Sequence, residues 1–556
     1  MLAPEVTTWS DIPWPEVEVH VHALQRRIYR AEKEGQRRKV RGLQRLLLKS
    51  TSAKLLAVRR VTQDNQGKKT PGVDGIAMLE PQERQATVAD LHLDRDPQPV
   101  RRIWIPKPGT EEKRPLGIPT IRDRCVQALV KQALEPQWEA RFEPNSYGFR
   151  PGRSCHDAIE SIYQHICHKS KYALDADIKK CFDRIDHQAL LNKLDTIPTI
   201  RRVVKKWLKA GIMEDLELSH PEKGTPQGGV ISPLLANIAL HGMEEAVHQV
   251  KKGKGDPHLV RYADDFVILH EDLQVIERCQ EAVRAFLTPM GLELKPEKTK
   301  ITHTLQEHEG CVGFDFLGYT VRQFPVGKHQ SGKSQKGTPL GFKTFIKPSK
   351  TKVKSHLDDL GRVIRSLHAA PQEELVDALN PKIQGWALYY RNSVAKRVYS
   401  DVDHQVYEKL RCWAHRRHPR KGSTWRGKRY WRSRGNAQWV FGTDKKSLLR
   451  HDRTKIIRHV KVRGAKTPFD GDWLYWSSRM GTYPGVGILM GRLLKRQGGR
   501  CVQCGHYFLP GQDLLERHHK DGDRKNNKRS NLELVRRHCH DAVHGAPAEG
   551  RPAEFP

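Results

Sequence analysis

The sequence predicts a multidomain α+β protein, and three observations support this. At 556 residues the chain is too long for one ordinary hydrophobic core, which implies about three to five folded units. Residues 76–322 alternate short strand-like runs with helical ones, as a single α+β unit does. Helical periodicity dominates on both sides of this unit, and the last tenth of the chain gathers histidines and cysteines. We therefore expect an α+β core, helical flanking units and a small C-terminal unit.

The charge of the chain indicates its partners. The formal net charge is +34 and the pI is about 9.8, an excess that repels itself in a compact fold and attracts polyanions. Nucleic acid is the expected partner, and an anionic membrane surface is the second alternative. The sequence has no run of about eighteen apolar residues, and the stretch MLAPEVTTWSDIPWPEVEV lacks the basic and apolar regions of a signal peptide. We expect a cytoplasmic, bacterial-type protein that meets the nucleoid through DNA and does not enter a membrane.

The first 75 residues are expected to form a basic helical extension. Between Glu16 and Val61, basic and apolar residues alternate at helical spacing, which predicts one or two amphipathic helices with positive outer faces. A merely solvated surface is the alternative. The stretch NQGKKTPGVDG that follows is rich in Gly, Pro and Lys and should be a loop.

Paired carboxylates mark the α+β unit. In LVRYADDFVIL, Asp264 and Asp265 lie between two strand-like runs. A hairpin turn is one explanation, because Asp is common in turns. The other is a divalent-metal site, which requires a further acid on a neighbouring strand. In YALDADI the two-residue period of a strand places Asp175 and Asp177 on one face, so Asp177, Asp264 and Asp265 meet the requirement of two-metal nucleotidyl transfer.

Residues 323–445 are expected to hold a connector and a helical unit. The stretch at about 322–342 is rich in Gly, Ser and Lys and predicts a mobile connector, and helical patterning resumes at Thr351. Between Arg411 and Val440 there is no acidic residue, and aromatic residues alternate with Lys and Arg, which suits phosphates and unstacked bases. A solvated basic face over core aromatics is the alternative. The candidate RNA or DNA contacts are Arg416, Arg417, Lys421, Arg426, Lys428 and Arg429.

The C-terminal cysteines and histidines have metal-ligand spacing. Seven of the ten cysteines are scattered singly, whereas Cys501 and Cys504 form a CxxC pair and Cys539 follows among histidines. His540 and His544 are four residues apart, so they would share one helix face and could hold one ion.

Seven blocks of this sequence, in this order, resemble the reverse transcriptases encoded by group II introns. The resemblance covers about 220 residues and implies a right-hand fold with fingers and palm. The blocks are IPKPGTEEKRPLGIPTIRDRCVQ, SYGFRPGRS, ALDADIKKCFDRIDH, GTPQGGVISPLLANI, RYADDFVIL, LKPEKTKIT and FDFLGY.

The resemblance implies roles for individual residues of these blocks. Asp177 and Asp264 would bind two Mg²⁺ ions, with Asp265 a weaker third acid. Phe182 would be an aromatic steric gate that leaves no room for a 2′ hydroxyl on the incoming nucleotide. The other implied nucleotide contacts are the phosphate-neutralising Lys107 and Arg114, the pocket residues Gln227 and Gly228, and Lys298, which would protonate the leaving pyrophosphate. For Lys298 a plain surface lysine is the alternative.

Three later blocks extend the resemblance. LNPKIQGWALYYR, with WAHRRHP and KRYW, resembles the thumb-like maturase region that binds intron RNA. SLLRHDRTKIIRHVKVRGAKTPFDGDWLYWSSR resembles the DNA-binding region that follows it. The C-terminal segment resembles an HNH nuclease, a ββα-metal fold with one Mg²⁺ or similar ion. There His519 would be the general base, His518 would join His540 and His544 as a metal ligand, and Asn531 would orient the base.

A structural Zn²⁺ beside the nuclease is also implied. Cys501, Cys504 and Cys539 would be its ligands. Members of this group often carry Cys or His three residues before the last cysteine, where this chain has Arg536. His538 could be the substitute, and an incomplete or lost zinc site is the other alternative.

These implications predict a multifunctional intron protein: RNA-directed DNA polymerase, maturase for its own intron, and DNA endonuclease whose cut primes cDNA synthesis in retrohoming. Its partners would be the group II intron RNA, target DNA and dNTPs; the oligomeric state is not predicted. A pure RNA-folding cofactor with relic sites is the first alternative, and a domesticated reverse transcriptase of a defence or diversity-generating system is the second.

We expect residues 322–342 and the tail after Gly545 to be disordered without a partner. The predicted domains are a basic helical extension (1–75), fingers and palm (76–322), connector and thumb or maturase domain (323–445), DNA-binding region (446–490) and HNH domain (491–556).

Overall fold

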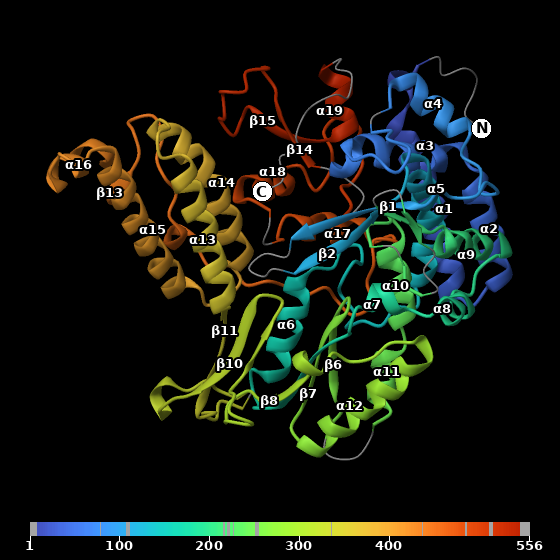
Figure 1. The fold of residues 1–556 in the computed structure, drawn as a ribbon, viewed down its shortest axis with the longest axis horizontal. Helices are drawn as coiled ribbons and strands as arrows, with labels where there is room; N and C mark the ends of the chain where they lie inside the picture. The colour runs from blue at the N-terminus through green and yellow to red at the C-terminus, as the bar shows by residue number, and fades with distance from the viewer. Residues whose placement is uncertain are drawn as a thin grey trace.

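The structure is a computed structural model, and Figure 1 shows how its parts are arranged. N-terminal helices and a finger-like sheet lie on one side, the palm sheet lies below them, and a helical thumb projects on the opposite side. The C-terminal segments lie between the thumb and the N-terminal helices. The structure describes residues 8–77, 79–106, 112–214, 217–219, 223–225, 227–250, 255–334, 336–435, 437–483, 486–510 and 515–544. The tail after Gly545 lies outside these residues.

The N-terminal extension folds into more helices than its periodicity predicted. Gly35, at a φ of +69°, lies in the turn that follows the first helix, and the Ser50 side chain caps the third by accepting a hydrogen bond from the Ala53 amide. Their apolar faces are buried against a long helix of the α+β unit, so only the outer faces are basic and exposed. The helices of the extension are α1 (Trp14–Lys33), α2 (Arg37–Lys49) and α3 (Thr51–Arg59). They are followed by α4 (Pro81–Ala89) and by the long α5 (Ile121–Glu139), against which they pack.

The palm is an antiparallel sheet in the strand order β6-β7-β3-β8. Alternate residues of its strands are buried on opposite faces: Leu174 and Ile268 share a core with helix α12, while Ala173 and Val267 share a second core with helix α6. The strands are β3 (Tyr172–Asp177), β6 (His258–Tyr262), β7 (Asp265–His270) and β8 (Lys300–His303), and the helices are α6 (Cys155–Ile166) and α12 (Leu273–Leu287).

A second sheet, in the order β2-β1-β4-β5, forms the fingers beside α5. Short helices connect it to the palm. The strands are β1 (Val100–Pro106), β2 (Lys113–Ile118), β4 (Ile212–Glu214) and β5 (Glu217–Ser219). The connecting helices are α7 (Cys181–Arg184), α8 (His187–Lys193), α9 (Pro198–Lys209), α10 (Ser232–Leu240) and α11 (Met243–His248).

The connector expected at residues 322–342 is the outer part of a β-hairpin, which corrects that prediction. Strand β10 continues through Arg322 to Pro325 and pairs with β11 over its whole length. The intervening loop is closed by hydrogen bonds from Gly332 and Leu340. Composition alone missed the alternating Val321, Gln323 and Ile346 that bury this hairpin against the palm. The strands are β9 (Phe314–Phe316), β10 (Tyr319–Pro325) and β11 (Phe342–Pro348).

The thumb is a bundle of three long helices, with a short helix and a small hairpin at its tip. Leu360, Leu379, Val402 and Trp413 form its own core. Its helices are α13 (Lys350–Ser366), α14 (Gln372–Tyr390), α15 (Lys396–Arg417) and the short α16 (Ser423–Tyr430), followed by β12 (Trp431–Arg434) and β13 (Ala437–Phe441).

The chain after the thumb returns to the body of the protein. It runs largely without regular structure to α17 (Trp473–Met480) and α18 (Ile488–Arg496), and then forms a strand–strand–helix unit. That unit contacts the N-terminal helices, since Arg59 pairs with Asp541 at 3.2 Å. Its elements are β14 (Leu515–His519), β15 (Leu532–Arg536) and α19 (Arg537–His544). Among the described helices, none combines the length and apolarity that a membrane crossing requires.

Candidate active site

Three carboxylates meet at the end of the palm sheet. Pairing of β3 with β7 places Asp177 directly opposite Asp265. Asp264 lies in the tight turn between β6 and β7, where Ala263 adopts a left-handed backbone with φ of +57°. The two adjacent aspartates are therefore hairpin-turn residues, and this turn brings them beside Asp177.

The carboxylates carry negative charge that the protein only partly balances. Burial, together with Asp264 and Asp177, raises the pKa of Asp265 to about 7. Burial and Asp177 likewise raise the pKa of Asp264. Burial, Asp265 and Asp315 raise the pKa of Asp175 to about 7. A cluster of this kind favours a cation, because a divalent ion would relieve the repulsion among these acids.

Lys298 supplies a positive charge at this cluster. Its Nζ lies 2.5 Å from Oδ2 of Asp177. Backbone bonding holds the segment in place, since the Lys295 amide donates to the Asp177 carbonyl at 2.8 Å. Burial lowers the pKa of Lys298, but the hydrogen bond and charge of Asp177 outweigh burial, so the pKa is raised. Lys298 is therefore a fixed component of the site.

A cavity of about 590 Å³ opens beside the carboxylates. Asp175, Asp177, Asp265 and Asp315 line it, together with Lys298 and the apolar residues of β9. This volume is within the range of small-molecule sites. The acidic side chains of its wall favour a cation in this cavity.

A buried polar network positions the turn that carries Asp264. Arg261 is fully buried, and its Nη1 donates to Oδ1 of Asn237 at 3.0 Å and to the Ala263 carbonyl at 3.2 Å. Asn237 in turn donates to the Gly148 carbonyl at 2.8 Å. A Cβ on Gly148 would lie 2.3 Å from the Ala263 amide nitrogen, so only glycine fits there. Sequence analysis assigned no role to these residues, although the glycine in SYGFRPGRS was the available signal.

Phe182 and Gln227 lie at the short helix α7, which follows β3. The Phe182 ring is 6.3 Å from that of Phe149, edge to face, and Phe149 is 51% exposed. Gln227 donates to Asp183 at 3.2 Å. Both predicted pocket residues are therefore anchored on or against the short helix α7 that follows β3.

Gly228 and Arg114 link the fingers to this side of the site. A Cβ on Gly228, whose φ is +112°, would lie 2.6 Å from the Gly117 carbonyl oxygen of β2. Arg114 is on the same strand and lowers the pKa of Asp264 and Asp265, although burial outweighs it. Lys107 lies outside the described residues.

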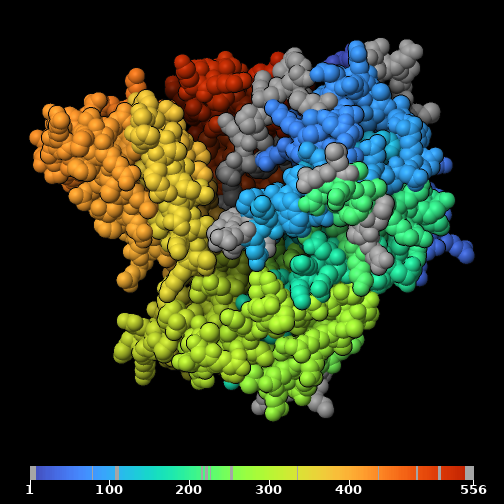
Figure 2. Space-filling view, viewed as in Figure 1, coloured from blue at the N-terminus to red at the C-terminus, as the bar shows by residue number. Residues whose placement is uncertain are grey.

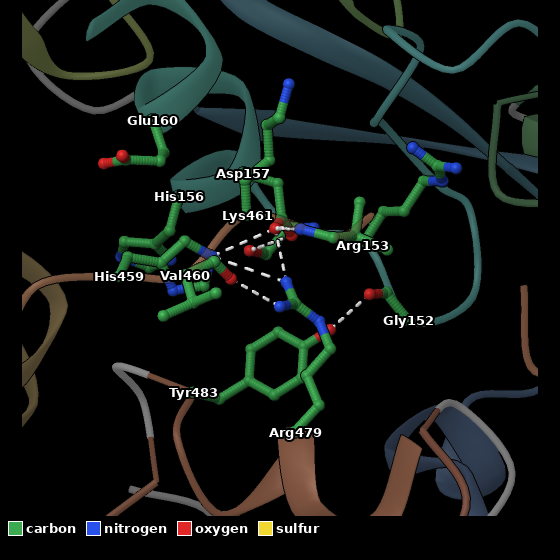
Figure 3. A network of polar contacts seen from close by, with 12 residues as sticks. Gly152, Arg153, His156, Asp157, Glu160, His459, Val460, Lys461, Arg479 and Tyr483 are labelled. Carbon is green, nitrogen blue, oxygen red and sulfur yellow. Dashed lines mark hydrogen bonds and ion pairs between the residues drawn. The ribbon is translucent and has the colours of Figure 1, made fainter. Parts of the chain in front are cut away.

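A second polar network joins the palm to the segment expected to bind DNA (Figure 3). Asp157 of α6 is completely buried and accepts hydrogen bonds from the Val462 amide at 2.8 Å, from His459 at 3.0 Å and from Arg479. Tyr483 donates to the Gly152 carbonyl. The segment is thus an integral part of the palm.

The C-terminal unit brings three of the predicted metal ligands together. The ring centroids of His540 and His544 are 4.6 Å apart, and that of His518 lies 5.6 Å and 5.2 Å from them. Nδ1 of His518 faces Glu533 at 3.1 Å, and Nδ1 of His540 faces Glu516 at 2.9 Å. A carboxylate on one ring nitrogen directs the other nitrogen to a metal.

His519 and Asn531 occupy the neighbouring loop. Nε2 of His519 lies 3.3 Å from Oδ1 of Asn527. The Asn531 side chain instead donates to Asp521 and to the Asn526 carbonyl, each at 2.8 Å. Through these two hydrogen bonds Asn531 holds the loop that follows His519 in place.

The thiols of Cys501, Cys504 and Cys539 converge within 4.8 Å of one another. Arg536 occupies the position where a fourth ligand was expected, and the possible substitute His538 does not join the thiols among the described residues. The Arg536 guanidinium lies 2.5 Å from Oε2 of Glu18 in α1, and Nδ1 of His538 lies 3.4 Å from the other oxygen of Glu18. The group is thus a three-thiol cluster among the described residues.

The six predicted nucleic-acid contacts divide into two sets at the end of α15 and on α16. Arg417 donates to the Ala370 carbonyl at 2.7 Å, and Arg426 donates to the His418 carbonyl at 3.2 Å, so both brace the backbone. The exposed set is Arg416, Lys421, Lys428 and Arg429.

Three segments of the chain match models of known protein families. Residues 105–321 match the model of the reverse transcriptase (RNA-dependent DNA polymerase) family. Residues 9–91 match the N-terminal domain of reverse transcriptase, and residues 353–431 match the group II intron, maturase-specific domain.

Similar proteins come from bacteria and from a protist. Group II intron-encoded protein LtrA of Lactococcus lactis subsp. cremoris is 32% identical over 373 residues, which cover 53% of this chain and 61% of that protein. Protein YkfC of Escherichia coli (strain K12) is 33% identical over 325 residues, 50% of this chain and 83% of that protein. Maturase-like protein 1 of Euglena gracilis is 26% identical over 407 residues, 70% of this chain and 79% of that protein. The chain thus spans about three fifths of the length of LtrA. By its carboxylate site, its matched domains and these relatives, the chain belongs to the family of group II intron reverse transcriptases with a maturase domain.

Proposed function

We propose that this protein is an RNA-directed DNA polymerase that also assists the splicing of a group II intron. The observation that carries the polymerase proposal is the meeting of Asp177, Asp264 and Asp265 at the ends of two paired strands, inside the segment that matches reverse transcriptases. Oxygen ligands, mutual repulsion and partial burial suit these three residues to Mg²⁺. When bound, two such ions would polarise the primer 3′ hydroxyl and neutralise the leaving pyrophosphate.

The residues around the acids would bind and orient the incoming dNTP. Arg114 offers a forked guanidinium to the phosphates, and Lys107 is proposed for the same task. Gly228 lets the backbone approach the nucleotide because it lacks a Cβ. Phe182, steadied by Phe149, would exclude a 2′ hydroxyl. Lys298 is held against Asp177, from where it would deliver a proton to the pyrophosphate.

Primer extension tests the polymerase proposal. The full chain with Mg²⁺, dNTPs and a primed RNA template should extend the primer, and Asp264→Ala should not. Binding of intron RNA should be equal in both. Extension by Asp264→Ala at the wild-type rate would show that the acids are not the site, and extension by neither protein would favour a splicing cofactor with a relic polymerase.

The maturase proposal rests on the match at residues 353–431 and on the basic surface of the thumb. Phosphates of the intron RNA would contact Arg416, Lys421, Lys428 and Arg429, because these cations are exposed. Splicing assistance should survive Asp264→Ala, since the thumb has a core separate from that of the acids. Loss of splicing together with cDNA synthesis would contradict this separation.

We further propose that the C-terminal unit is an HNH DNA endonuclease. The clustering of His518, His540 and His544 on a strand–strand–helix unit supports a divalent ion there, and His519 would accept the proton of the attacking water. In retrohoming, its cut in the second target strand would supply the primer for cDNA synthesis. His519→Ala should abolish metal-dependent cleavage of DNA but leave primer extension intact. Cleavage by His519→Ala at the wild-type rate would refute this assignment.

The three thiols are proposed to bind a structural Zn²⁺. Cys501, Cys504 and Cys539 supply the softer ligands that Zn²⁺ prefers. Removal of the metal with a chelator should destabilise the C-terminal unit if the site is loaded. Zinc analysis of the purified chain, compared with Cys504→Ser, measures occupancy independently of nuclease activity.

A further inference from the structure

Trp439, at the tip of the thumb, combines strain with exposure. Its φ is +60° and its side chain is 60% exposed. The hairpin pairs Arg432 with Val440 and Arg434 with Ala437, so Trp439 belongs to a bulge on β13. Glycine normally fills such a left-handed position, because a Cβ is crowded there. Burial does little to offset the strain of this tryptophan, which points to a use for its ring outside the fold.

The ring of Trp439 is supported on one side and open on the other. A Cβ on Gly427 of α16 would come within 2.8 Å of the Trp439 ring, so the ring lies directly against the backbone at that glycine. Gly427 is itself buried. The indole is therefore held as a flat apolar plate whose remaining surface faces solvent.

Basic residues predominate in the chain around this plate, and the nearby acid Asp444 lies 3.6 Å from Arg432 on the paired strand. No acidic residue occurs from Arg411 to Val440. Lys428 and Arg429 follow Gly427 directly and are exposed, and Lys421 lies 5.6 Å from the ring centre of Trp425, which is 40% exposed. Figures 1 and 2 show this tip at the outer edge of the molecule, away from the palm.

We propose that the tip binds unpaired nucleotides of RNA, with Trp439 as the stacking surface for a base and the neighbouring cations as phosphate contacts. A base within a duplex already has both faces stacked, so an open indole selects bases in loops or single strands. This inference rests on the proposed RNA binding by the thumb and specifies the part of the RNA that the tip contacts.

Binding of two RNA probes by the full chain tests the proposal. One probe is a hairpin with an unpaired loop, and the other is a blunt duplex of equal length. Trp439→Gly should bind the looped probe about tenfold more weakly and bind the duplex as the wild type does. Its melting temperature should be equal or higher, because glycine relieves the left-handed backbone. Gln438→Ala, an exposed neighbour on the same strand, should leave both affinities unchanged.

A second pair of variants holds the strain constant. Trp439→Phe keeps an aromatic face and Trp439→Leu does not, so phenylalanine should retain most of the looped-probe affinity and leucine should lose it. Arg429→Gln should instead weaken both probes and reduce the salt dependence of binding.

Several results would overturn the inference. Wild-type affinity of Trp439→Gly and Trp439→Leu for the looped probe would exclude stacking, and an equal loss on both probes would mean a basic surface only. Failure of the wild-type chain to bind either probe would refute the proposed RNA binding itself.

Discussion

The proposed polymerase site derives its electrostatic character from individual carboxylates placed closer together than their repulsion favours. Asp177 and Asp265 face each other across paired strands, and Asp264 occupies the turn between them and β6. Lys298 offsets part of this charge through its 2.5 Å contact with Asp177. Each of these residues is fixed by backbone hydrogen bonds, so the site is arranged before any substrate binds.

Substitution of Phe182 tests the residue proposed to select deoxynucleotides. Phe182→Ala should raise the ratio of ribonucleotide to deoxynucleotide incorporation at least about tenfold, because space for a 2′ hydroxyl is created. Single-nucleotide extension with each substrate measures this ratio. Phe149→Ala, which removes only the supporting ring, should give a smaller change, and an unchanged ratio in Phe182→Ala would remove the steric-gate role.

The acids of the site could be predicted from sequence, but their supports could not. A strand period of two and a hairpin turn suffice to bring Asp177, Asp264 and Asp265 together. The hydrogen bond from Arg261 to Asn237 could not be predicted from the two residue types, because the tertiary fold determines whether an arginine is buried and which group it meets. For Lys298 the resemblance implied a place in the site, but its contact with Asp177, 121 positions away, depends on the tertiary fold.

At the scale of elements, helix α6 anchors the segment that follows the thumb. Although burial acts against it, hydrogen bonds and charge from His459 and Arg479 hold the pKa of Asp157 well below its usual range. Asp157→Asn would leave Arg479 buried without its counter-charge, which should lower the free energy of unfolding by about 3–5 kcal/mol. Hydrogen exchange at residues 459–480 should therefore accelerate.

Glu160→Gln is the matched control for Asp157→Asn. Glu160 lies about one turn further along α6 (Figure 3), and its side chain accepts a hydrogen bond from Gln164 at 3.1 Å. Exchange at residues 459–480 should match the wild type in this variant. Equal exchange in both variants would mean that Asp157 does not anchor the segment.

A buried histidine pair joins two thumb helices to the segment that follows the thumb, and it should make stability depend on pH. Nε2 of His356 on α13 lies 2.9 Å from Nε2 of His451, whose Nδ1 faces Asp403 at 2.7 Å. Burial and His451 lower the pKa of His356 from 6.5 to about 3. Between these pH values the unfolded chain binds a proton that the folded chain does not, so the free energy of unfolding falls as pH falls, by up to about 1.4 kcal/mol per unit.

The variant His356→Phe isolates this contribution. Phenylalanine can keep the stacking on Trp386, whose ring lies 4.6 Å from that of His356. Between pH 6.5 and pH 4 the free energy of unfolding of His356→Phe should depend less steeply on pH than that of the wild type. Denaturant unfolding measures this difference. Parallel pH profiles would contradict a buried neutral His356.

Over the whole molecule, the C-terminal unit docks on the N-terminal helices through buried charges. Glu18 of α1 is 6% exposed and binds both Arg536 and His538. Arg536 stands where a fourth zinc ligand was expected, and here its side chain serves the contact between domains. The predicted domain boundaries stay a prediction, and this interface depends on three-dimensional packing that no local pattern encodes.

Glu18→Gln should loosen this docking. Arg536 would remain buried with its charge uncompensated, which should destabilise the docked unit by about 3 kcal/mol. Hydrogen exchange at residues 532–544 should therefore increase. Glu16→Gln, an exposed acid on the same helix, should leave exchange unchanged. Unaltered exchange in Glu18→Gln would show that the ion pair does not hold the unit.

The most direct test of a divalent-metal polymerase site at Asp177, Asp264 and Asp265 is to map where the metal binds. Fe²⁺ can replace Mg²⁺ at oxygen ligands, and with peroxide it cleaves the nearby backbone. With primer, RNA template and dNTP bound, cleavage should fall near residues 177 and 264–265 and should disappear in Asp264→Asn. Cleavage elsewhere in the palm, or an unchanged pattern in Asp264→Asn, would contradict the assignment of these acids as the metal site.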